Sequence, residues 1–134
     1  MVQTSEILIG SAGGDHVSIK IGSPNREEWR GAEVEVRCDG WIGRMRASFM
    51  KGELGRFSEE IRQLHRKLSG SAELQPLEPN LTLALTGDGK GHVTVDGTAR
   101  NDFAGGTRLV FRFEIDQTLL DDIADALSDA DPMA

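Results

Sequence analysis

The side chains that could act as nucleophiles, bases or metal ligands are few and are scattered along the chain. The three histidines, His16, His65 and His92, and the single cysteine, Cys38, fall in different segments of the 134-residue sequence. Catalysis by such groups needs a second reactive side chain within hydrogen-bonding reach, and no spacing ties these four together. His92 and Asp96 could share the wet face of one strand, but an alternating polar face explains them equally well. The residues predict no catalytic site, no metal site and no cofactor, and leave open an active site assembled only in three dimensions.

The glycine-rich segment from Gly87 to Gly91 is the nearest approach to a phosphate-binding loop. A P-loop places Ser or Thr directly after its Gly-Lys pair and continues into a helix, whereas Lys90 is followed by glycine and by strand-like residues. A hairpin explains the segment better, because a three-residue loop from Asp88 to Lys90 keeps the apolar residues of both strands on one face. This loop pairs Leu85 with Val93.

Acidic side chains are concentrated at the C-terminal end. Residues 114–134 hold 7 of the 22 acidic residues and no Lys or Arg, so the net charge of −7 lies entirely there. Such an end repels nucleic acids and anionic membranes and attracts a basic protein surface. The simplest interpretation is a solvated helix face whose first acids suit the positive end of the helix. The alternative is a docking face for a basic partner, formed by Asp121, Asp122, Asp125 and Asp129.

The elements that must position these groups are strands. Between Leu81 and Ile115, three runs place their apolar residues on odd numbers, the pattern of an antiparallel sheet with one buried face. A longer loop is expected from Arg100 to Thr107. Shorter strands are expected at Glu6–Ile9, His16–Ile21 and Ala72–Leu77.

The segment from Ala32 to Phe49 predicts a hairpin closed by Asp39 and Gly40, because an Asp-Gly pair favours a type I′ turn. This register sets Cys38 opposite Trp41 on the core face, so we expect a buried, unreactive thiol. On the other face it sets acidic residues opposite basic ones, as in the pair formed by Glu35 and Arg44. Two independent faces therefore agree on one register.

Two amphipathic helices complete the pattern. Apolar residues recur at three and four positions between Gly52 and Ser69. After Ile115, Asp116 or Thr118 can cap a second helix, whose apolar positions include Leu120 and Ile123. We expect one α+β domain over residues 1–134, with an acidic C-terminal helix and short tail from about residue 116. About seven antiparallel strands would form one strongly twisted sheet, or two packed sheets, covered by the two helices.

Six stretches, in this order and spacing, carry a family resemblance: Trp29 with Ala32–Cys38, Arg44–Phe49, Glu53–Phe57, Leu77–Leu83, Gly89–Val95 and Phe113–Leu120. In them the chain resembles the WapI-type family of bacterial immunity proteins. The resemblance implies a small cytoplasmic protein that neutralises the toxic C-terminal domain of a polymorphic toxin. It implies no catalytic residues. The lack of a signal-peptide pattern or an apolar run long enough for a membrane span also favours the cytoplasm.

These observations favour a non-catalytic immunity-type protein that binds and occludes a basic toxin domain, of nuclease type, without contacting nucleic acid or membrane. The alternative is a binding or scaffold domain for an unknown ligand, which could form a homodimer through an exposed strand edge.

Overall fold

The computed structural model describes residues 5–102 and 105–132, and in them the chain forms two four-stranded antiparallel sheets and two α-helices. Sheet A is a meander of β1 (Ser5–Gly10), β2 (His16–Ile21), β3 (Trp29–Cys38) and β4 (Trp41–Met50). After α1 (Glu53–Lys67), sheet B is a second meander of β5 (Ser69–Leu74), β6 (Leu81–Asp88), β7 (His92–Asp102) and β8 (Gly105–Asp116). A short 3₁₀ turn (Gln117–Leu119) leads into α2 (Leu120–Ala130). The predicted α+β class is confirmed, in its form with two packed sheets and with eight described strands.

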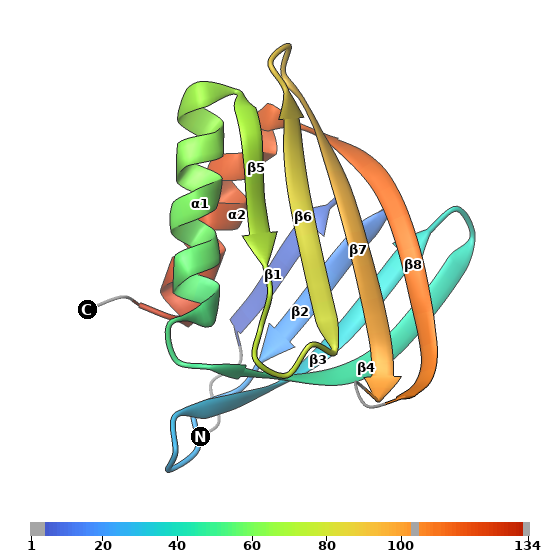
Figure 1. The fold of residues 1–134 in the computed structure, drawn as a ribbon, viewed down its shortest axis with the longest axis vertical. Helices are drawn as coiled ribbons and strands as arrows, with labels where there is room; N and C mark the ends of the chain where they lie inside the picture. The colour runs from blue at the N-terminus through green and yellow to red at the C-terminus, as the bar shows by residue number, and fades with distance from the viewer. Residues whose placement is uncertain (1–4, 103–104, 133–134) are drawn as a thin grey trace.

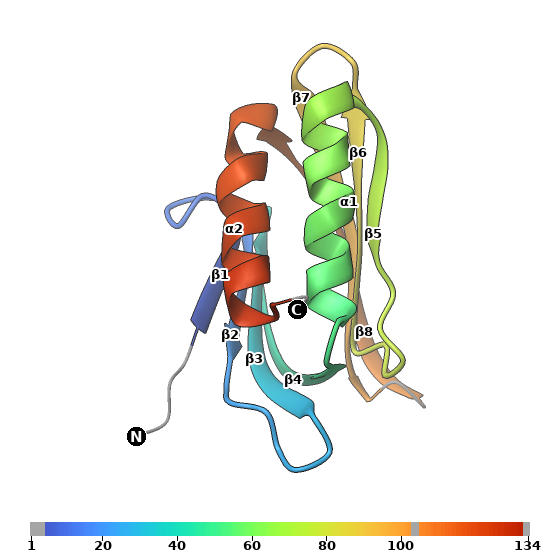
Figure 2. The same cartoon turned by 90° about the vertical axis from the view of Figure 1, so that its left-hand side faces the viewer.

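The two sheets face each other, and the two helices lie side by side along one flank (Figures 1 and 2). In this flank α1 packs along β5 and α2 packs along β1, so the helix pair bridges the first strands of both sheets. The core between the layers holds the odd-numbered apolar residues of sheet B, as the alternation predicts. On the opposite flank, β4 and β8 each pair with only one neighbour among the described strands.

The β3–β4 hairpin has the predicted register, with Cys38 opposite Trp41 and Glu35 opposite Arg44. Asp39 and Gly40 have positive φ angles of 51° and 85°, as a type I′ turn requires. The prediction that Trp41 is buried on the core face is wrong, because this residue is 69% exposed. Its strand position matches that of the buried Cys38, but Trp41 is the first residue of β4, and the turn of this hairpin extends past β8 in Figure 1.

The register of the β6–β7 hairpin differs from the prediction by two residues. Leu85 pairs with Val95 rather than Val93, and the loop begins one residue later than expected. The Asp88 carboxylate causes the shift, because it accepts hydrogen bonds from the backbone N–H groups of Lys90 and His92, at 2.6 and 3.1 Å. A two-residue shift leaves every side chain on its predicted face.

Two further boundaries are corrected. The expected loop from Arg100 to Thr107 is mostly strand, because β7 continues to Asp102 and β8 begins at Gly105; residues 103 and 104 lie outside the described residues. The expected strand Ala72–Leu77 is β5, which spans Ser69–Leu74. It starts directly after α1 because Leu68 takes the left-handed conformation that ends the helix.

Candidate partner-binding surfaces

The acidic helix α2 lies antiparallel to α1 and meets its basic side chains. Asp125 Oδ1 is 3.0 Å from Arg62 Nη2, and Asp121 Oδ1 is 3.4 Å from His65 Nδ1. Beneath these pairs the Ser58 hydroxyl donates a 2.7 Å hydrogen bond to the carbonyl of Ala124. Part of the negative charge of α2 is therefore balanced within the molecule.

Asp131, just after α2, has a structural role that the sequence did not indicate. Its side chain is 1% exposed, and its carboxylate accepts hydrogen bonds from the N–H of Gly52, at 3.0 and 2.9 Å, and from that of Gly55, at 3.0 Å. These donors belong to the first turn of α1, which has no side-chain cap of its own. A residue 79 positions away thus caps α1 and fixes the end of α2 to its start.

The four aspartates predicted to bind a partner all lie on exposed positions of α2. Asp121 and Asp125 form the ion pairs with α1. Asp122 and Asp129 have no ion pair among residues 5–102 and 105–132. The structure thus brings the four together on one helix, with two of them free to attract an external cation.

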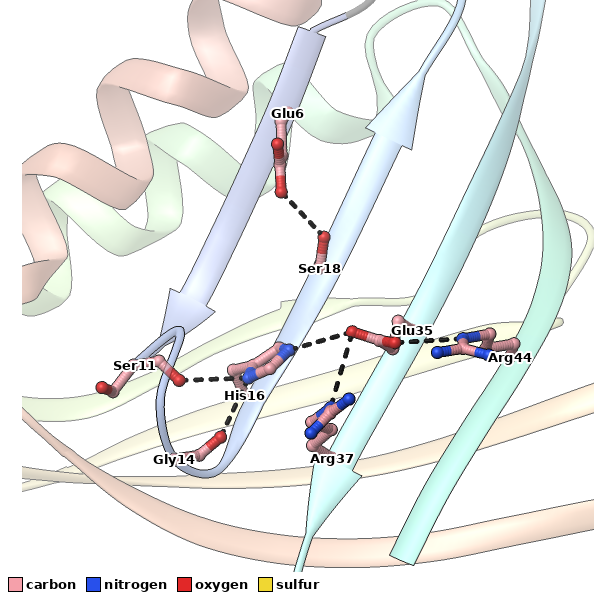
Figure 3. A network of polar contacts seen from close by, with 8 residues as sticks. All are labelled: Glu6, Ser11, Gly14, His16, Ser18, Glu35, Arg37 and Arg44. Carbon is pink, nitrogen blue, oxygen red and sulfur yellow. Dashed lines mark hydrogen bonds and ion pairs between the residues drawn. The ribbon is translucent and has the colours of Figure 1, made fainter.

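A second polar surface, which the sequence analysis missed, lies on the outer face of sheet A (Figure 3). His16 is only 5% exposed there. Its Nδ1 contacts the carbonyl oxygens of Ser11 and Gly14, at 3.0 and 2.9 Å, and its Nε2 lies 3.3 Å from Glu35 Oε2. The ring therefore ties the β1–β2 turn to β3.

Glu35 connects this histidine to two arginines. Its carboxylate accepts a 3.0 Å hydrogen bond from Arg44 Nε and lies 3.8 Å from Arg37 Nε. The hydrogen bond from His16, and then that from Arg44, holds the pKa of Glu35 below its ordinary value of 4.5. The network lines a hollow of about 720 Å³, whose other walls include Leu8, Ala12 and Arg46.

The sequence could not assemble this network because it depends on which strands are neighbours. His16 and Glu35 are 19 residues apart and meet because β2 pairs with β3 so that Ser18 faces Glu35. The other histidines lie elsewhere. His92 and Asp96 do share one face of β7, as the sequence allows, but each has a different partner: His92 Nδ1 is 3.1 Å from Asp88, and the Asp96 carboxylate is paired with Arg112.

Three groups that could ligate a metal converge at the turn end of sheet A. One oxygen of Asp15, one of Asp39 and the Cys38 sulfur lie within 4.8 Å of one another. Burial raises the pKa of the Cys38 thiol, which donates a 3.2 Å hydrogen bond to the carbonyl of Arg112. Because metals bind the thiolate, a protonated, donating thiol does not favour a metal site here.

A model of the WapI-like immunity protein family matches residues 7–130. The chain belongs to this family. The resemblance noted in the sequence is thereby confirmed. No curated protein matches the chain.

The WapI-like match runs from β1 to the end of α2, so both sheets, the helix pair and the acidic helix fall within it. Among the described residues, no helix is long and apolar enough to cross a membrane.

Proposed function

We propose that the chain is a non-catalytic cytoplasmic immunity protein that binds the toxic domain of a cognate toxin and covers its active surface. The observation that carries the proposal is membership of the WapI-like immunity family over residues 7–130. The toxin we expect is a basic domain of nuclease type, because a surface that binds nucleic acid is positively charged and complements an acidic inhibitor.

The acidic face of α2 is the surface we assign to steering this association. Its members are Asp121, Asp122, Asp125 and Asp129. Charges at the rim of an interface mainly raise the association rate. Asp122 and Asp129 should contribute most, because Asp125 is already paired with Arg62 and Asp121 already lies 3.4 Å from the His65 ring.

The test is the association rate of the chain with the C-terminal toxin domain encoded beside its gene. Steering predicts a rate that falls steeply as salt is added, with little change in dissociation. Asp129→Lys should slow association, and combining it with Asp121→Lys and Asp125→Lys should slow it further.

Glu114→Lys is the matched control. Glu114 is exposed on sheet B, outside α2, and it has no ion pair in the described part of the chain, so its reversal changes the net charge by the same amount. Equal slowing by Asp129→Lys and Glu114→Lys would mean that only net charge matters and would remove α2 from the mechanism. If the variant that carries all three α2 substitutions folds and still associates at the wild-type rate, α2 is likewise removed from the mechanism.

The alternative function, a scaffold domain that forms a homodimer, would use β4 or β8 as an open edge. β8 is 12 residues long, and edges of this length can pair with another chain. However, Arg44 and Arg46 on β4 place cations along that edge, which opposes pairing of two β4 edges. Sedimentation of the chain alone would settle the point, since a stable dimer would favour the scaffold.

A further inference from the structure

The turn end of sheet A presents the most exposed aromatic surface in the described part of the chain. Trp41 and Ile42 open β4 and are 69% and 52% exposed. Their side chains lie on opposite faces of the strand, because Trp41 pairs with Cys38 and Ile42 with Arg37. In Figure 1 the turn of the β3–β4 hairpin extends past β8, while Cys38, which pairs with Trp41, is buried and contacts β8.

This hairpin end is held in place by contacts with two other parts of the fold. The Cys38 sulfur donates to the carbonyl of Arg112 on β8, at 3.2 Å. The N–H of Asp39 donates to the Asp15 carboxylate in the β1–β2 connection, also at 3.2 Å. A type I′ turn fixes the backbone between these anchors. The backbone that carries Trp41 is therefore already ordered in the free protein, so less conformational entropy is lost when a partner binds.

The charges at the same turn indicate what kind of partner the turn end suits. The Asp15 and Asp39 carboxylates approach within 4.8 Å, and both residues are exposed. No Lys, Arg or His nitrogen of the described residues comes within 4.0 Å of either carboxylate. Two neighbouring like charges without a counter-ion repel each other, and a cation from a partner would relieve that repulsion.

We propose that this turn end, formed by Trp41, Ile42, Asp15 and Asp39, anchors the toxin by receiving an arginine or lysine beside an apolar contact. Trp41 provides the apolar contact on its face of the strand and Ile42 extends it on the other, and the two carboxylates select a basic occupant. The cation would lie against the indole ring, where a cation–π contact forms, and within reach of a carboxylate. Tryptophan is enriched among the few residues that dominate binding energy at protein interfaces.

The inference rests on the proposed function and adds the anchoring surface to it. α2 packs along β1, one edge strand of sheet A, whereas Trp41 and Ile42 open β4, the other edge strand, so steering and anchoring would act at different edges of the sheet. Charges that steer change the association rate, whereas a buried aromatic anchor changes the dissociation rate. The two roles can therefore be separated by kinetics.

The experiment measures binding of the full chain to the C-terminal toxin domain encoded beside its gene. Trp41→Ser should weaken binding by about thirty-fold or more, mainly through faster dissociation, as loss of a dominant aromatic contact does. Leu77→Ser is the matched control, because Leu77 is 70% exposed but lies in the connection between β5 and β6. It should bind as wild type does. Asp15→Asn keeps an oxygen for the Asp39 N–H and should weaken binding about three- to ten-fold through lost charge.

A second measurement uses the native tryptophan. In a Trp29→Phe variant, Trp41 is the only indole, and its emission should shift to shorter wavelength when the toxin domain covers it. If wild type binds but Trp41→Ser binds equally tightly, or the emission does not move, the turn end is not the anchor and the proposed function stands. If wild type does not bind the toxin domain, the proposed function and this inference both fail.

Discussion

Replacing Asp131 by alanine should destabilise the whole fold, although this residue lies three positions from the end of the sequence and belongs to its acidic tail. Asp131 is 1% exposed, and its carboxylate accepts hydrogen bonds from two backbone N–H groups at the start of α1. Alanine would leave the N–H groups of Gly52 and Gly55 without this acceptor and would remove the hydrogen bonds that join the end of α2 to the start of α1.

The magnitude follows from these contacts. Loss of a helix N-cap costs about 0.5–2 kcal/mol, and a hydrogen bond to a charged group contributes about 1.5–3 kcal/mol. The two figures overlap, because the same carboxylate provides both, so we expect about 2–4 kcal/mol for Asp131→Ala. Asp131→Asn keeps one acceptor oxygen and should cost about half as much.

Urea unfolding followed by circular dichroism measures the effect. A loss of this size should move the midpoint down by about 1–2 M with little change in slope. Asp129→Ala is the control, because it removes an exposed aspartate two residues earlier and should change the free energy of unfolding by less than about 0.5 kcal/mol. Equal midpoints for the two alanine variants would refute the capping role.

Three further predictions concern the core and the outer network. Cys38 should react with a thiol reagent only as fast as the protein unfolds, because it is buried with a raised pKa; rapid labelling of the native chain would contradict this. Ile123→Ala should lower the free energy of unfolding by about 2–5 kcal/mol, as large-to-small core changes do, and a neutral result would mean that the buried face of α2 is wrongly assigned. Because a hydrogen bond from His16 lowers the pKa of Glu35, its stabilisation is present above pH 4.5 and is lost as the pH falls below that value. Glu35→Gln should therefore flatten the acid side of the stability profile, and Glu33→Gln, on the same face without an ion pair among the described residues, should not.

The parts of the fold that local patterns determine could be predicted. The β3–β4 register follows from Asp39 and Gly40 together with two faces that agree, and the structure confirms it residue by residue. The β6–β7 register could not be chosen in the same way, because a two-residue shift leaves both faces unchanged. In that hairpin the Asp88 side chain favours the observed register by accepting hydrogen bonds from the loop backbone, and the alternation of apolar and polar residues does not predict these bonds.

The parts that depend on contacts between distant segments could not be predicted. In the sequence, Asp131 looks like one of several acidic residues near the C-terminus. Its role as the cap of α1 depends on α2 running antiparallel to α1. His16 and Glu35 meet only because β2 and β3 are neighbours with a particular register. The exposure of Trp41 depends on how the second sheet packs against the end of the β3–β4 hairpin, which a hairpin pattern cannot show.

The measurement that tests the central claim most directly is a titration of the purified toxin domain with this chain, following the activity of the toxin. A non-catalytic inhibitor predicts that inhibition is complete at a fixed stoichiometric ratio. It also predicts that the toxin, separated under denaturing conditions and refolded, regains its activity with an unchanged mass. Inactivation by far less than a stoichiometric amount, or a lasting change in the mass of the toxin, would show that the chain acts as an enzyme. No inhibition at a large excess would contradict the immunity function itself.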